Sequence, residues 1–107
     1  MIRRRLIFFG QVQGVGFRWT ARMLAAHHSC TGWVHNERDG SVSMEIQGEQ
    51  QSIDRIIASL NEDRYIRIDK IESTDLPVEA GETEFRQGLR MTIRFISQLF
   101  CCFFEKF

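Results

Sequence analysis

The hydrophobic positions of this chain follow two periods, which predict strands in some segments and helices in others. Residues 4–11 contain a continuous apolar run that predicts a buried strand. Residues 31–35 predict a second strand, and the clean alternation over residues 41–47 predicts a third strand that is half-buried. The side chains expected to face inward from this third strand are Val42, Met44 and Ile46.

Two other segments have helical spacing, at residues 18–28 and at roughly residues 50–62. The apolar face of the first helix comprises Phe17, Ala21, Leu24, Ala25 and His28. The apolar face of the second comprises Ile53, Ile56, Ile57 and Leu60. Both segments therefore predict amphipathic helices that pack one face on a core.

The chain beyond the second helix predicts two further strands. One strand begins at residues 66–69, and its alternation slips at Lys70 and Ile71, as it does at a β-bulge. Pro77 is expected to end this strand. Residues 83–86 fit a short edge strand.

The order of these elements is strand, helix, strand, strand, helix, strand. The Asp39-Gly40 pair predicts a tight hairpin between the second and third strands. This order is the split β-α-β pattern of class α+β, a ferredoxin-like α/β sandwich (βαββαβ) in which an antiparallel sheet carries both helices on one face. The architecture hosts enzymes, RNA-binding domains and regulatory modules, so it does not by itself indicate a function.

Length and composition narrow the range of functions. The chain has 107 residues, and its 14 basic and 14 acidic side chains balance, which argues against a broad nucleic-acid-binding surface. No apolar run is typical of a signal peptide or a membrane span, so a cytoplasmic protein with no stable membrane insertion is expected. Three cysteines without metal-ligand spacing fit a reducing compartment, and Cys30 is expected to be a small buried hydrophobe.

The end of the chain does not fit the predicted sandwich. The sandwich is complete by residue 87, and residues 88–107 form an apolar, aromatic extension. Three interpretations stay open: an extra strand or helix packed on the domain, a disordered tail, or an interface for a second copy or a membrane surface. We therefore expect a domain at residues 1–87 followed by this extension. We also expect the protein to be a monomer unless the extension mediates association.

The segment most suggestive of chemistry is residues 10–18, where three glycines and Arg18 lie between a predicted strand and a predicted helix. Backbone N–H groups in such a loop, together with the helix dipole, favour anion binding. Arg18 adds a planar fork of donors that suits phosphate oxygens. The spacing differs from that of a P-loop or a dinucleotide fingerprint, so a single phosphoryl group fits better than a polyphosphate. The alternative is a plain tight turn in which the glycines supply positive φ angles.

A second candidate is Asn36, at the end of a predicted strand just before the hairpin. Its side chain is suited either to forming the turn through a hydrogen bond to nearby backbone or to holding a water with its amide donor and acceptor.

Together, residues 11–18 and 32–42 resemble the two signature motifs of the acylphosphatase family, at a similar separation and on the same elements. A weaker likeness extends from residue 47 to about residue 86. The family is a ferredoxin-like sandwich that hydrolyses carboxyl-phosphate anhydrides, so the resemblance implies an acyl phosphate as the small-molecule substrate, inorganic phosphate as a product, and no metal or cofactor. It also implies that Arg18 binds the phosphoryl group with the loop amides and that Asn36 orients the attacking water. The phosphate-binding residues implied are Gln13, Gly14, Val15, Gly16, Phe17 and Arg18.

The chemistry of an acyl phosphate is consistent with so small a set of residues. The leaving carboxylate is stable without a proton, so no general acid is required, and phosphoryl transfer depends mainly on positioning and charge stabilisation. The alternative function is a non-catalytic anion-binding or protein-interaction module on the same fold. RNA binding is disfavoured because the aromatic strand motif and the positive net charge are lacking.

The remaining polar and aromatic candidates have simpler interpretations. His27 and His28 close the first helix, where capping or packing is expected. His35 is expected on the exposed face of the sheet, and no histidine belongs to a cluster with metal-ligand spacing. Trp19 and Trp33 are interpreted as packing residues, with the alternative that Trp19 lines the substrate mouth. The arginines at residues 3–5 are expected to be a solvated strand edge.

Overall fold

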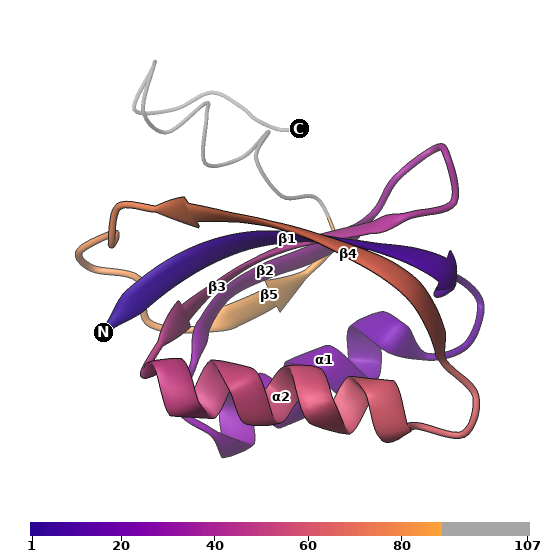
Figure 1. The fold of residues 1–107 in the computed structure, drawn as a ribbon. Helices are drawn as coiled ribbons and strands as arrows, with labels where there is room; N and C mark the ends of the chain where they lie inside the picture. Colours follow the sequence, from indigo (N-terminus) through magenta and orange to yellow (C-terminus); the bar gives the residue numbers. More distant parts are fainter. Residues whose placement is uncertain (89–107) are drawn as a thin grey trace.

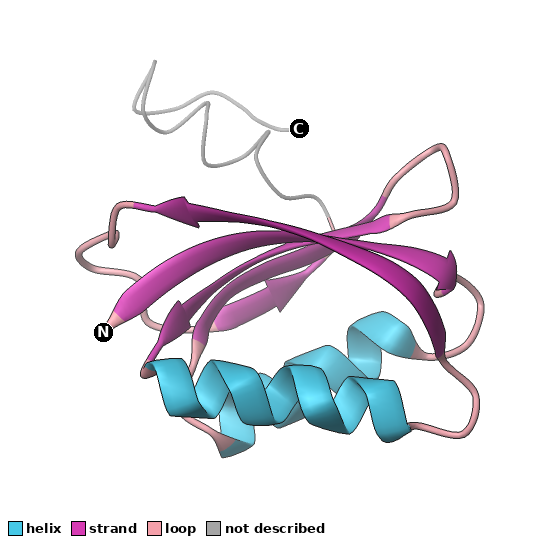
Figure 2. Cartoon of the chain, viewed as in Figure 1, coloured by secondary structure: helices cyan, strands magenta, loops and turns pink. Residues whose placement is uncertain are grey.

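Both helices pack on the same face of a β-sheet (Figure 1), and Figure 2 shows the two layers by element type. The structure is a computed structural model, and it describes residues 1–88. The elements in chain order are β1 (Ile2–Gln11), α1 (Phe17–His27), β2 (Thr31–Asn36), β3 (Val42–Gly48), α2 (Gln50–Glu62), β4 (Arg67–Leu76) and β5 (Phe85–Gln87). The predicted ferredoxin-like α/β sandwich is confirmed. All but the first residue of the predicted extension lies outside the described residues.

The sheet formed by residues 1–88 has five strands in the order β4-β1-β3-β2-β5. β1 pairs antiparallel with β3 and β4, and β2 pairs antiparallel with β3. β5 pairs parallel with β2, so the sheet is mixed, and the expectation of an antiparallel sheet holds only for the other four strands. The parallel pair arises because residues 77–84 carry the chain from one edge of the sheet to the other.

The predicted irregularity near Lys70 is present as a change of register between β1 and β4. Phe9 pairs with Lys70, whereas the next residue, Gly10, pairs with Ile68. Asp69 therefore has no counterpart in β1, which is the arrangement of a β-bulge. β4 ends at Leu76, directly before Pro77, as expected.

The hydrophobic core lies between the sheet and the two helices. α1 contributes Phe17, Ala21 and Ala25, and α2 contributes Ile53, Ile56 and Leu60. They pack against the inward side chains of the central strands, including Leu6, Phe8, Val34, Val42, Met44 and Ile46. The helical faces and the inward side of β3 predicted from the periodicity thus form one core.

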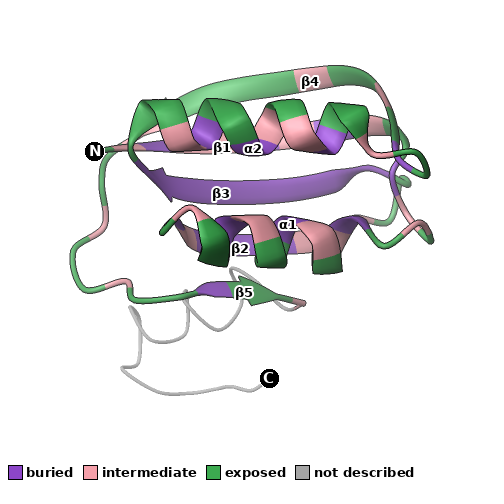
Figure 3. Cartoon of the chain, turned by 90° about the horizontal axis from the view of Figure 1, so that it is seen from below, coloured by how far each residue is buried: buried purple, intermediate pink, exposed green. Residues whose placement is uncertain are grey.

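The expectation that β3 is half-buried is wrong, because all seven of its residues are buried, as Figure 3 shows. On the face away from the helices, Glu45 and Gln47 are covered by the side chain of Arg3, which is only 1% exposed. Arg3 Nη2 lies 2.9 Å from a Glu45 carboxylate oxygen, and Arg3 Nη1 lies 2.7 Å from a Glu82 carboxylate oxygen. β3 is central in the sheet, and its outer face is closed by a polar cluster rather than by water.

The same cluster corrects the expectation that residues 3–5 form a solvated strand edge. β4 pairs along the outer side of β1, so β1 is an interior strand, and Arg3 lies beneath the crossing segment at residues 77–84. Gln47 holds this segment against the sheet through two hydrogen bonds. Its side chain accepts a hydrogen bond from Glu79 N (2.7 Å) and donates one to Glu79 O (2.9 Å). Burial lowers the pKa of Arg3, but hydrogen bonds with Glu82 and Glu45 outweigh it and raise the pKa overall, which keeps Arg3 charged.

Two further packing predictions are confirmed. Cys30 is a free buried cysteine, and burial raises the pKa of its thiol. Trp33 is 5% exposed and packs within the domain. In the part of the chain that the structure describes, neither helix has the length and apolar character needed to cross a bilayer.

Candidate active site

The loop that follows β1 and the β2–β3 hairpin lie at the same end of the sheet (Figure 1), and a small cavity lies between this loop and the end of β2. The cavity has a volume of about 150 Å³. It is lined by Val12, Gly14, Gly16, Phe17, Arg18, Trp19, Asn36 and Gln87. Arg18 and Asn36, which lie in different predicted motifs, therefore line the same cavity.

The glycine loop leaves the first amides of α1 without side-chain partners. Gly14 and Gly16 have φ angles of 75° and 80°, in the left-handed region that favours glycine, and a Cβ at either would meet nothing within 4 Å. Gly16 is the N-cap of α1, so no side chain caps the helix, and the first turn contains no acidic residue. The backbone N–H groups of the first turn lack intrahelical acceptors, so an anion is a suitable acceptor for them.

Gly10 has a different role from the two loop glycines. It belongs to β1, where its φ angle is 135°, and a Cβ there would lie 2.2 Å from the backbone oxygen of Arg67. This glycine permits close approach of β4 at the bulge, whereas the loop glycines supply a turn conformation.

Arg18 is half-buried beside the open amides. Within residues 1–88, no carboxylate forms an ion pair with it, whereas five of the other nine arginines in this range have such a partner. Among the described residues, no side chain neutralises the positive charge of Arg18, which favours binding of an anion in the cavity.

Asn36 is the last residue of β2 and pairs with Val42 across the start of the hairpin. The turn contact that we considered for it is made by Asp39 instead, whose carboxylate accepts a hydrogen bond from Ser41 N (2.9 Å) and another from Ser41 Oγ. These hydrogen bonds lower the pKa of Asp39. Asn36 thus lines the cavity, while Asp39 makes the hydrogen bonds of the turn.

Gln13 connects the loop to the hairpin. Its side-chain Nε2 donates hydrogen bonds to the backbone oxygens of Glu37 (2.7 Å) and Ser41 (2.9 Å). Gln13 and Val15 do not line the cavity, in contrast to the other four residues of the implied phosphate-binding set. The side chain of Gln13 therefore positions the loop relative to the hairpin.

The structure adds a cavity residue that the sequence did not indicate. Gln87, from β5, lines the cavity although nothing near it resembles a motif. The end of β5 is held where Gly88 N donates to Val34 O (3.0 Å) and the Gly88 carbonyl lies within hydrogen-bond distance of His35 Nδ1. His35 is half-buried by this contact rather than exposed as expected.

His27 and His28 lie at the far end of α1, where their rings are in an edge-to-face arrangement 5.0 Å apart. Neither lines the cavity. Over residues 1–88, no group of three His, Cys, Asp or Glu side chains is arranged to hold a metal ion.

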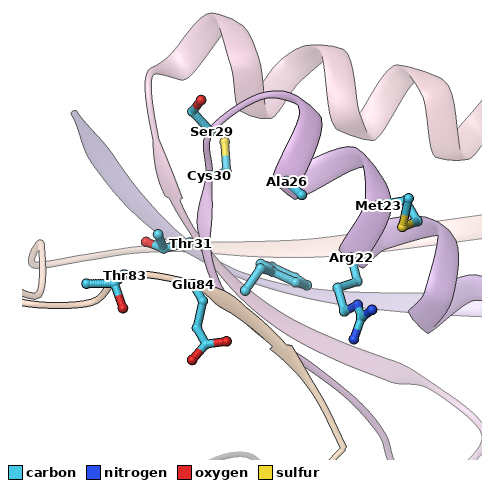
Figure 4. A pocket seen from close by; sticks show the side chains of 9 residues that line it. Arg22, Met23, Ala26, Ser29, Cys30, Thr31, Thr83 and Glu84 are labelled. Carbon is cyan, nitrogen blue, oxygen red and sulfur yellow. The ribbon is translucent and has the colours of Figure 1, made fainter.

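A second, larger hollow of about 630 Å³ lies between α1 and β5 (Figure 4). Its lining includes Arg22 and Met23 from the exposed side of α1, and Glu84 from the segment that enters β5. None of its lining residues belongs to the glycine loop or is Asn36, so its size alone does not associate it with the predicted chemistry.

The arrangement defines a class of protein: a ferredoxin-like α/β sandwich with a glycine loop, an arginine and an asparagine around one small cavity. Comparison with known proteins identifies the family. The family model described as Acylphosphatase matches residues 4–87, which include both motifs. The chain therefore belongs to the acylphosphatase family of hydrolases, and the resemblance stated from its two motifs is confirmed.

Individual relatives agree with this assignment. The chain is 43% identical over 72 residues to an acylphosphatase of Leuconostoc mesenteroides, covering 65% of this chain and 80% of the relative. It is 36% identical over 88 residues to an acylphosphatase of Clostridium acetobutylicum, covering 80% and 97%. The crystal structure of acylphosphatase from Bacillus subtilis superposes with a TM-score of 0.75 at 28% identity, covering 81% of this chain and 98% of that one.

Proposed function

We propose that this protein hydrolyses the carboxyl-phosphate anhydride of acyl phosphates to a carboxylate and inorganic phosphate. Membership of the acylphosphatase family supports the reaction class. The observation that carries the residue assignment is that one cavity joins the uncapped start of α1, Arg18 and Asn36, the last residue of β2.

In this proposal the phosphoryl group binds to the Arg18 guanidinium and to backbone amides of the loop residues that line the cavity, namely Gly14, Gly16, Phe17 and Arg18. The uncapped helix start and the lack of an ion pair for Arg18 within residues 1–88 support this mode of binding. Hydrogen bonds to charged groups contribute about 1.5–3 kcal/mol each, so several of them hold a small dianion firmly. The same donors stabilise the charge that spreads over the phosphoryl oxygens in the transition state.

Asn36 orients the attacking water in this scheme, since its amide offers both a donor and an acceptor. The water oxygen forms a bond to phosphorus while the bond from phosphorus to the acyl oxygen breaks. The electron pair leaves with the carboxylate, which needs no proton, and the water proton is lost to phosphate or solvent. The cavity residues include neither a histidine nor a carboxylate, in keeping with a reaction that requires no general acid.

The catalytic unit in this proposal is the domain at residues 1–87, since both the family match and β5, the last strand among the described residues, end at residue 87. It acts without a metal or cofactor, as a cytoplasmic monomer to which residues 88–107 form an extension. The buried free thiol of Cys30 suits a reducing compartment.

The test is whether the full chain hydrolyses benzoyl phosphate, which is measured as a loss of substrate absorbance. The same assay is repeated with inorganic phosphate added as an inhibitor. We expect turnover and competitive inhibition, because phosphate occupies the site of the transferred group. Calorimetric binding of phosphate without any turnover would overturn the enzymatic assignment and favour an anion-binding module.

A further inference from the structure

The cavity at the start of α1 is small, so a phosphoryl group fills much of it. Its volume of about 150 Å³ lies well below the ~300–1,000 Å³ that is usual for enclosed small-molecule sites. If the phosphoryl group binds inside, as the proposed function requires, a bulky acyl group such as benzoyl extends to the rim. Residues on the rim then decide which acyl groups bind well.

Trp19 provides the exposed apolar surface at this rim. The cavity is lined by two other large apolar side chains, Val12 and Phe17, but these are 1% and 2% exposed. Trp19 is 60% exposed, although tryptophan is highly buried on average in proteins and Trp33 is 5% exposed here. Its other exposed neighbours on the rim are glycines and the polar Gln87.

Trp19 lines the same cavity as Arg18. The two residues are consecutive in the first turn of α1. Within residues 1–88, no aromatic ring or cation stacks on the Trp19 indole, whereas Phe9 and Tyr65 each have a cation near the ring. An indole face left open beside a phosphate site suits a flat apolar group, because aromatic pairs gain attraction beyond the area that they bury.

We infer that Trp19 is the binding surface for the acyl group and that acyl phosphates with aromatic acyl groups are the preferred substrate class. The inference rests on the proposed function. It assigns substrate specificity to Trp19, a residue that has no role in the proposed function.

The experiment compares kcat/KM for benzoyl phosphate with kcat/KM for acetyl phosphate, in the wild type and in Trp19→Ala. We expect the ratio to fall about three- to tenfold in Trp19→Ala, the range for loss of one aromatic contact, and to be largely kept in Trp19→Phe. Tyr65→Ala is the matched control, since Tyr65 is 67% exposed but does not line the cavity, and its ratio should equal that of the wild type.

A binding measurement makes the test independent of turnover. Phenyl phosphate and inorganic phosphate are compared as competitive inhibitors, and Trp19→Ala should weaken phenyl phosphate about three- to tenfold more than phosphate. Equal ratios in wild type and Trp19→Ala, with both substrates still hydrolysed, would overturn this inference and leave the acylphosphatase assignment standing. If the wild type hydrolyses neither benzoyl phosphate nor acetyl phosphate, both the proposed function and this inference are overturned.

Discussion

The side-chain amide of Gln13 donates a hydrogen bond to the backbone oxygen of Glu37 over 2.7 Å, which ties the glycine loop to the β2–β3 hairpin. A second bond from the same nitrogen reaches Ser41 O. Arg18 follows this loop and Asn36 precedes Glu37 in the hairpin, so Gln13 sets the relative position of the two proposed catalytic residues.

We expect Gln13→Ala to lower the free energy of unfolding by about 1–2 kcal/mol, because two hydrogen bonds to backbone oxygens are lost. It should also lower kcat/KM about 10- to 100-fold, since a small misplacement of reacting groups is costly. Urea denaturation and steady-state kinetics measure the two effects. Gln11→Ala, at an exposed position two residues earlier, is the control and should change neither quantity appreciably.

Arg18→Ala should raise KM and lower kcat, with a total loss of about 100- to 1,000-fold in kcat/KM for an acyl phosphate. The reason is that one preorganised donor to the developing charge typically contributes this much. Arg22→Ala is the matched control, because Arg22 lies on the same helix but is exposed and does not line the small cavity. Equal losses in the two variants would mean that general charge, not the cavity, matters.

Asn36→Ala should lower kcat by about 100-fold while KM changes little, because an oriented water contributes to the chemical step rather than to phosphate binding. Asn36→Asp keeps the shape but places a negative charge near the phosphoryl group, so KM should rise as well. Steady-state kinetics with benzoyl phosphate distinguish the two patterns. Wild-type kcat in Asn36→Ala would remove Asn36 from the mechanism.

Arg3→Ala should destabilise the fold by about 3–5 kcal/mol, because it leaves the buried Glu45 carboxylate without its main cation. Arg4→Ala is the control on the same strand. Its partners Asp54 and Asp75 are exposed, so a loss of at most about 1 kcal/mol is expected. Chemical denaturation of both variants measures the difference, and similar values would contradict the assignment of Arg3 as the centre of a buried cluster.

The lowered pKa of Asp39 makes a prediction about pH. Hydrogen bonds from Ser41 stabilise the ionised carboxylate in the folded state, so the stabilisation is present above the ordinary pKa of 3.8. It is lost as the pH falls below that value and through the folded-state pKa. An NMR titration of the Asp39 carboxyl carbon should give a pKa below 3.8 in the wild type and one closer to 3.8 in Ser41→Ala. An unchanged pKa in Ser41→Ala would show that the Ser41 hydroxyl is not the main cause of the lowered pKa.

Local pattern was sufficient to predict most of the fold. The alternation around Met44 and the helical spacing around Ile56 each report which side of an element is apolar, and one apolar side per element is enough to assemble the core. Each of the two motifs also consists of residues that are close together in the chain, since Arg18 directly follows its glycine loop and Asn36 directly precedes its hairpin. Their resemblance to the acylphosphatase motifs is sufficient to predict that Arg18 and Asn36 belong to one site.

The polar face of the sheet could not be predicted in this way. Glu45 alternates with apolar residues, which is the pattern of an exposed side chain on a half-buried strand. Arg3 belongs to a run of three arginines, and such a run predicts side chains in contact with solvent. Both are buried because residues 77–84 cross over the sheet and bring Glu82 to Arg3, a contact between residues 79 positions apart. Periodicity carries no information on such a contact.

The sequence by itself determined the element order, the apolar core faces, the family and the two motifs, because each of these depends on residues close together in the chain. Only the tertiary structure decided that β5 pairs parallel with β2, that Arg3 is buried, and that Gln13 holds the hairpin. It likewise decided that Gln87 and the exposed Trp19 share a cavity with Arg18. These features depend on which strands become neighbours, and strand order is set by the packing of the whole domain rather than by any one segment.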